Sequence, residues 1–96
     1  MKRNNQIVIE LIVNNHPGVM SHITGLFSRR GYNLDGILCG AIGEGSTSVM
    51  YLLVQMNDNY QQVIHQLEKL HDVIEIKGRT EYDHKVFYNI KNFFEI

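Results

Sequence analysis

Apolar residues recur along the chain in two patterns, one typical of strands and one of helices. Residues 7–13 alternate with a period of two, which predicts a β-strand. A helical stripe follows and ends near Arg29-Arg30-Gly31; its members are Val19, Ile23, Leu26 and Phe27. Pro17 fits the first helical position, because its missing N–H has no partner there. Gly31 is expected to end this helix.

The next hydrophobic segments predict two strands, a helix and a last strand. Residues 32–42 form a strand that contains two glycines, which mark close approach of another backbone or a ligand. After a turn at 43–46, residues 47–56 are apolar in both phases, as in a central or doubly covered strand. Asp58 and Gln61 resemble a capping box before a helix, and residues 73–77 form a short strand that Gly78 closes.

The order β-α-β-β-α-β predicts an α+β, ferredoxin-like fold with a four-stranded antiparallel sheet and two helices on one face. The other face is expected to pack against a partner or a second copy. Residues 1–80 form this domain, and residues 81–96 are expected to be an amphipathic tail helix. Its apolar stripe consists of Val86, Ile90, Phe93 and Phe94. The tail either packs on its own domain or docks in a groove on a partner.

Composition narrows the class of protein. The 96 residues suit one domain, and the net charge of -1 is scattered rather than clustered, which disfavours nucleic acid and anionic membranes as partners. No apolar run has transmembrane length, and residues 1–6 lack the apolar core of a signal peptide. Cys39 is the only cysteine, so we expect no intrachain disulfide and a cytoplasmic location.

Catalytic and metal chemistry find little support in the sequence. The five histidines lack the i, i+4 spacing of a helical metal site, and no cysteine or carboxylate cluster accompanies them. Ser21 and His22 are adjacent, so their side chains do not face each other on a helix. Cys39 lies between apolar neighbours in a strand, where a buried, unreactive thiol is expected. We therefore expect neither a catalytic residue nor a metal ligand.

A small-acid site is the better-supported possibility. Pro17 and Gly18 precede the first helix, and amides at a helix N-terminus attract carboxylates. Asn15 before the helix and Asn33 after it carry amides that donate to a carboxylate and accept from an ammonium group. The alternative is that Asn15 only caps the helix and Asn33 only occupies a turn.

The run Asn15-His16-Pro17-Gly18-Val19-Met20, followed by Gly25-Leu26-Phe27-Ser28-Arg29-Arg30-Gly31-Tyr32-Asn33, resembles the ACT domain of acetolactate (acetohydroxyacid) synthase small subunits. Gly36–Cys39 and the tail residues Phe93-Phe94 are most similar to the isozyme I branch of that family. The resemblance implies a non-catalytic regulatory subunit that binds valine, a feedback inhibitor, and activates a catalytic large subunit. Thiamine diphosphate, FAD and magnesium then belong to the large subunit, and this chain binds no cofactor.

The resemblance also implies which residues bind valine: Asn15, His16, Pro17, Gly18, Val19, Met20, Ser21, Asn33 and Gly40. Asn33 and Gly40 would come from the neighbouring subunit of a homodimer whose second strands meet edge to edge. Longer family members carry a second domain, in place of which this chain has only its tail. The alternative is a stand-alone amino-acid-binding ACT module that regulates another enzyme or a transcription factor.

Overall fold

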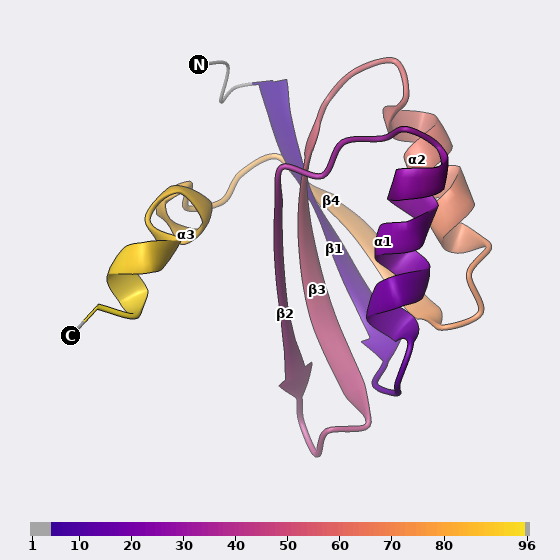
Figure 1. The fold of residues 1–96 in the computed structure, drawn as a ribbon, viewed down its shortest axis with the longest axis horizontal. Helices are drawn as coiled ribbons and strands as arrows, with labels where there is room; N and C mark the ends of the chain where they lie inside the picture. Colours follow the sequence, from indigo (N-terminus) through magenta and orange to yellow (C-terminus); the bar gives the residue numbers. More distant parts are fainter. Residues whose placement is uncertain (1–4, 96) are drawn as a thin grey trace.

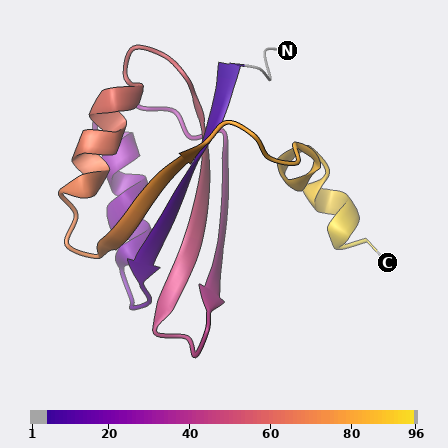
Figure 2. The same cartoon turned by 180° about the vertical axis from the view of Figure 1, so that it is seen from behind.

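The computed structural model describes residues 5–95, which fold as an antiparallel sheet covered by two helices on one face (Figures 1 and 2). The elements are β1 (Gln6–Asn14), α1 (Val19–Arg29), β2 (Gly36–Ile42), β3 (Thr47–Gln55), α2 (Tyr60–Glu68), β4 (Val73–Arg79), the short helix α3 (Lys85–Tyr88) and a 3-10 turn at Ile90–Phe93. The strand order is β2-β3-β1-β4. The ferredoxin-like prediction is therefore confirmed. Residues 1–4 and 96, which the expected domain and tail include, lie outside the described residues.

The hydrophobic core lies between the two central strands and the two helices. β1 pairs with both β3 and β4, with Ile9 opposite Leu52 on one side and Gly78 on the other. Phe27 of α1 and Leu67 of α2 are buried against this sheet. The central position of β3 explains why both phases of its sequence are apolar. Helices cover one face, and the other is partly covered by the C-terminal tail.

The start of α1 differs from the sequence prediction, and its end agrees with it. Pro17 does not occupy the first helical position: the helix begins at Val19, and Pro17 lies in the preceding turn. The reason is Gly18, whose φ of 92° is incompatible with helical geometry and reverses the chain just before the helix. At the other end, Gly31 has φ 70° and follows the last helical turn as expected.

The remaining boundaries shift by a few residues. The expected capping box at Asp58 is wrong: Asn59 is the N-cap of α2, and no side chain caps it. Asn57 instead accepts a hydrogen bond from the Asn59 amide at 2.9 Å, which stabilises the turn before the helix. β2 begins at Gly36 rather than at residue 32, and Gly78 lies within β4 rather than closing it.

The tail is helical, but it is not one helix. Asn89, with φ -117° and ψ 28°, separates α3 from the 3-10 turn. The first part packs on the sheet, because Phe87 lies against Gly36 beside Leu53. The second part points its aromatic residues outward, with Phe93 65% and Phe94 81% exposed. The first part of the tail therefore packs on its own domain, and the last part leaves its aromatic side chains exposed. The domain boundary at residue 80 stays a prediction.

Gly36 and Gly40 offer a matched test of tail packing. A Cβ on Gly36 would lie 2.7 Å from Phe87 Cδ1, whereas a Cβ on Gly40 would meet nothing within 4 Å. We expect Gly36→Ala to lower the free energy of unfolding by about 1–3 kcal/mol, as overpacking does. Gly40→Ala should change it by less than about 0.5 kcal/mol. Chemical denaturation checks both, and equal effects would contradict this packing of Phe87.

Candidate functional site

The β1–α1 loop (residues 15–18) presents an uncapped helix N-terminus. No side chain caps α1, and its first turn carries no acidic residue. The His22 amide donates to the Gly18 carbonyl at 2.9 Å, which begins the helical pattern. Within residues 5–95, the amides of Met20 and Ser21 have no hydrogen-bond acceptor. These amides and the helix dipole can therefore bind a small anion.

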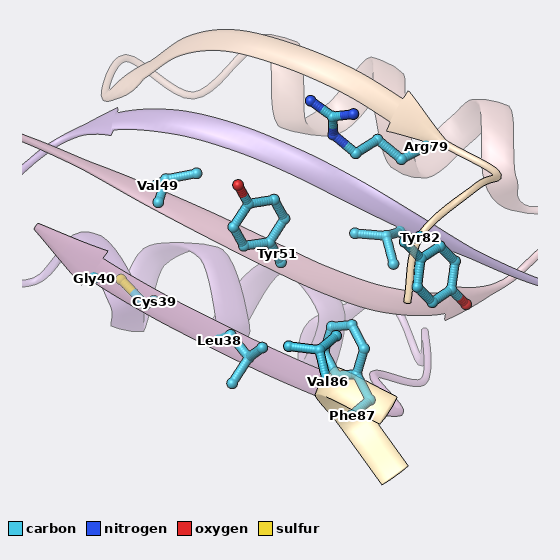
Figure 3. A pocket seen from close by; sticks show the side chains of 10 residues that line it. Leu38, Cys39, Gly40, Val49, Tyr51, Arg79, Tyr82, Val86 and Phe87 are labelled. Carbon is cyan, nitrogen blue, oxygen red and sulfur yellow. The ribbon is translucent and has the colours of Figure 1, made fainter. Parts of the chain in front are cut away.

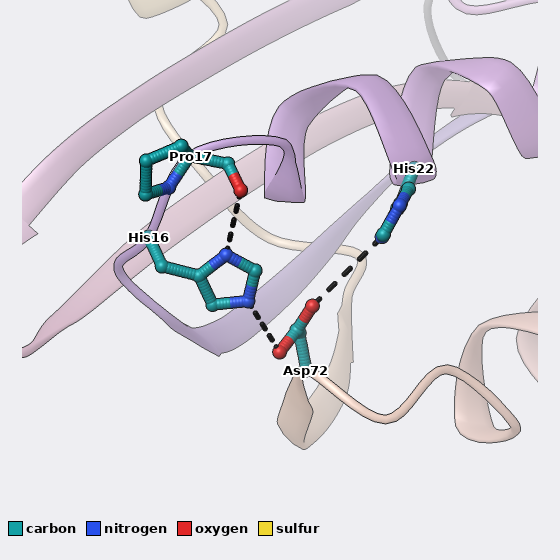
Figure 4. Close-up of polar contacts among 4 residues, drawn as sticks. All are labelled: His16, Pro17, His22 and Asp72. Atoms are coloured by element: carbon teal, nitrogen blue, oxygen red, sulfur yellow. Dashed lines mark hydrogen bonds and ion pairs between the residues drawn. The ribbon is translucent and has the colours of Figure 1, made fainter.

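Two contacts fix the loop to distant parts of the chain. The Asn15 side-chain amide donates to the Gly45 carbonyl at 2.7 Å, and its backbone amide donates to Ser46 at 3.0 Å. On the other side, His16 Nε2 lies 2.7 Å from Asp72 Oδ1, just before β4 (Figure 4). The loop is thus held between the β2–β3 turn and the start of β4.

The other expected ligand residues of the first helical turn differ in exposure. Val19 is buried in the core, so only its backbone is available to a ligand. Met20 and Ser21 are exposed beside it. Residues 15–18, which precede the helix, are exposed as well.

His16 is held in a setting that favours its protonated form. A hydrogen bond to Asp72 is the main reason that its pKa is raised above the usual value, and the Pro17 carbonyl, 2.7 Å from Nδ1, adds to the effect. The same bond lowers the pKa of Asp72. The ion pair therefore contributes fully to stability between the ordinary pKa of an aspartate and that of a histidine. This contribution is lost as the pH rises through the raised pKa of His16 or falls through the lowered pKa of Asp72.

Asn33 lies far from the β1–α1 loop within one chain. It follows the C-terminal end of α1, a helix of eleven residues and hence about 16 Å long. Its amide nitrogen donates to Asp35 Oδ1 at 2.6 Å, and Asp35 Oδ2 accepts from Gln6 and Gln55 at 3.0 and 2.7 Å. This network leaves the amide oxygen of Asn33 available as an acceptor.

Gly40 is also separate from the loop. It lies in the edge strand β2 opposite Val49, which places it on the face away from the helices. One chain therefore brings residues 15–21 together, and it does not bring Asn33 or Gly40 to them.

A hollow that the sequence did not predict lies under the tail, on the sheet face that was expected to pack against a partner or a second copy (Figure 3). Its volume is about 320 Å³, and apolar side chains of β2, β3 and the tail form most of its wall. Its one cation, Arg79, is paired with Glu10. The alternating apolar residues Val8, Val49 and Tyr51 were the signal that could have found this surface.

Two kinds of reactive group can be located in the structure, the thiol of Cys39 and the side chains that could bind a metal ion. Cys39 is exposed, which corrects the expectation of a buried thiol; it lies in an edge strand, where no further strand of the chain covers it. Partial burial still raises its pKa, so the thiolate is disfavoured. Residues 5–95 contain no group of three or more His, Cys, Asp or Glu that could hold a metal ion. In the same residues, no helix has the length and apolar character needed to cross a membrane.

Comparison with known proteins identifies relatives along most of the chain. Residues 9–75 match the family described as the AHAS small subunit-like ACT domain. The chain is 43% identical over 89 residues to the acetolactate synthase isozyme 1 small subunit of Escherichia coli K12, covering 93% of this chain and 92% of that protein. It is 38% identical to a probable acetolactate synthase small subunit of Archaeoglobus fulgidus, covering 76% of this chain and 46% of that protein.

Solved structures agree with this assignment. The acetolactate synthase small subunit of Thermotoga maritima superposes with a TM-score of 0.69 and 30% identity, over 76% of this chain and 46% of that chain. The regulatory subunit of aspartate kinase from Thermus thermophilus gives a TM-score of 0.67 and 25% identity, over 79% and 51% of the two chains. The fold, the β1–α1 loop and these relatives lead to one conclusion: the chain belongs to the family of acetolactate synthase small subunits and carries the ACT domain of that family.

Proposed function

We propose that this chain is a non-catalytic regulatory subunit that activates the large subunit of acetolactate synthase and binds valine as a feedback inhibitor. The observation that carries the ligand assignment is the uncapped N-terminus of α1 behind Gly18, with the free amides of Met20 and Ser21. Thiamine diphosphate, FAD and magnesium belong to the large subunit in this proposal. The small subunit acts by stabilising one state of the complex more than another.

The loop offers partners for both charged groups of an α-amino acid, the carboxylate and the ammonium group. The helix amides bind the carboxylate, and amide oxygens of asparagine accept from the ammonium group. Asn15 donates to Gly45 through its nitrogen, so its amide oxygen is not used in that bond. A second acceptor comes from Asn33 of the partner subunit, whose own nitrogen is held by an aspartate. The aliphatic side chain of valine then lies against the seam between subunits.

A homodimer formed through β2 supplies this arrangement. β2 is an edge strand, so one row of its backbone hydrogen-bonding groups has no neighbouring strand. A two-fold axis between two β2 strands pairs them antiparallel. The N-terminal end of β2 in one subunit, which follows Asn33, then lies near the C-terminal end of β2 in the other subunit. That C-terminal end is beside the β1–α1 loop. Each dimer contains two such seams.

Cys39 provides a direct probe of this dimer. It is the central residue of the seven in β2, and it is exposed. Near a two-fold axis, two copies of it lie close together. We therefore expect a short bismaleimide to link most of the protein into dimers. The reagent is applied at pH 8 because partial burial raises the thiol pKa. Cys39→Ser is the control, and sedimentation equilibrium checks that the dimer exists without the reagent. A monomer at all concentrations would refute the proposal.

The alternative is an ACT module that regulates a different enzyme or a transcription factor. The superposition on the regulatory subunit of aspartate kinase favours it, because the same fold serves another enzyme there. Co-purification with an acetolactate synthase large subunit, assayed with and without valine, separates the two. Stable association and an increase in activity that valine reverses support the regulatory subunit. Valine binding without association supports the alternative.

A further inference from the structure

His16 and Asp72 join the β1–α1 loop to the start of β4 through an unusual pair of contacts. His16 Nε2 lies 2.7 Å from Asp72 Oδ1, and its Nδ1 lies 2.7 Å from the carbonyl oxygen of Pro17. Figure 4 shows the ring between these two oxygens. Each oxygen is a hydrogen-bond acceptor, so both ring nitrogens must carry protons for both contacts to be hydrogen bonds. Only the imidazolium form meets that condition.

We propose that His16 and Asp72 are positioning residues. The ion pair between protonated His16 and ionised Asp72 holds the β1–α1 loop in its ligand-binding conformation, so that valine binds more weakly as His16 loses its proton. The inference rests on the proposed function, because it concerns regulation of the same site. Neither residue needs to touch the ligand. Their effect reaches it through the backbone of Pro17 and Gly18.

Loss of the proton forces a change next to Gly18. A neutral imidazole has one N–H, so one nitrogen lone pair then faces an oxygen at 2.7 Å. If Nε2 keeps the proton, the Pro17 carbonyl must turn away, and the peptide that precedes Gly18 turns with it. If Nδ1 keeps it, the bond to Asp72 is lost and the loop is released from β4. Both outcomes displace the amides that open α1.

Two other histidines lie near the pair. His22 of α1 places Nδ1 3.9 Å from Asp72 Oδ2, and His71 lies close enough to Asp72 to influence its charge. Asp72 is 12% exposed and His16 43% exposed in their side chains, so the carboxylate is the more sheltered partner. His22 is more exposed, at 66%, and its contact is longer, so it is the natural control.

A first experiment needs no ligand. Nuclear magnetic resonance titration of the full chain, from pH 5 to pH 9, follows the imidazole signals of all histidines and the backbone amide of Gly18. We expect His16 to titrate above the ordinary histidine value near 6.5, because Asp72 raises its pKa, and the Gly18 amide to shift with the same midpoint as His16. Titration of His16 at the ordinary value near 6.5, or a Gly18 amide that does not follow it, overturns the proposal.

The second experiment measures the valine dissociation constant by calorimetry across the same range. We expect affinity to fall by about fivefold to tenfold as His16 loses its proton, which is within the usual range for coupled sites. His16→Gln should remove this step, whereas His22→Gln should keep it. Any effect of valine's own ionisation on the dissociation constant is the same for every variant. It therefore cancels when the pH profiles of the variants are compared.

Asp72→Asn distinguishes positioning from a purely structural role. The asparagine oxygen still accepts from Nε2, but it no longer stabilises the cation, so the step in affinity should move to lower pH. Binding should then match the unmodified protein at pH 5.5 and be weaker at pH 7. An equal loss at every pH means that Asp72 is only structural and overturns the proposal. Absence of valine binding at any pH refutes the proposed function instead, and the ligand-free titration still tests the His16–Asp72 pair.

Discussion

Gly18→Asp is expected to weaken valine binding by about fivefold to a thousandfold while leaving activation of the large subunit intact. The new carboxylate lies beside the free amides of Met20 and Ser21, where the carboxylate of valine should bind. Two like charges about 4 Å apart cost on the order of 1–4 kcal/mol at a partly solvated site, and each 1.4 kcal/mol corresponds to about tenfold in affinity. The aspartate can also accept from the same amides itself.

Gly18→Asn is the control that this experiment requires. Gly18 has φ 92°, a conformation that other residues adopt only with strain of about 1–2 kcal/mol. Asparagine has the same shape as aspartate and shares this strain, but it carries no charge. Calorimetric titration with valine and thermal unfolding of both variants separate the two effects. If both variants lose affinity equally, the charge is not responsible, and the loss comes from backbone strain or from capping of the amides by either side chain.

Phe93→Ser combined with Phe94→Ser is expected to reduce affinity for the large subunit by about thirtyfold or more. Both rings are largely exposed on the tail, at 65% and 81%. Aromatic residues that become buried at an interface commonly contribute about 2 kcal/mol or more each. Because neither ring packs on the sheet, the fold and valine binding should be unchanged. Activation of the large subunit at increasing small-subunit concentration measures the effect.

Lys91→Ala is the matched control for the tail. Lys91 lies in the same 3-10 turn, and its ion-pair partner among residues 5–95 is Glu95, at 3.5 Å on the exposed surface. Its removal should change activation little, because exposed ion pairs contribute about 1 kcal/mol or less. If the double phenylalanine variant activates as well as the unmodified protein, the outward part of the tail does not contact the large subunit.

Hydrophobic periodicity was sufficient to predict the fold. The alternating residues of β1 and the stripe of Val19, Ile23 and Phe27 have the periods that their elements require, and all three helical residues are buried. Boundaries were less predictable where glycine or side-chain hydrogen bonds set them. Gly18 excludes Pro17 from the helix, and the three amides on Asp35 hold residues 33–35 out of β2.

Of the predicted site residues, one chain brings together only those that are consecutive in sequence. Residues 15–21 surround a helix N-terminus, and sequence motifs identify such positions. The contact of His16 with Asp72 spans more than fifty residues, and it depends on the register of β4, so no local pattern indicates it. The break at Asn89 was also hidden, because the apolar spacing of the tail fits one continuous helix.

The attachment of the β1–α1 loop has a consequence for the order in which the chain folds. The loop comes early in the sequence, yet its fixed partners are Gly45 and Ser46 in the β2–β3 turn and Asp72 before β4. β1 also needs β4 as its second neighbour. During synthesis from the N-terminus, the loop therefore cannot reach its final shape until residue 72 has left the ribosome. A nascent chain cut short before that point would lack the binding conformation, even with residues 15–21 complete.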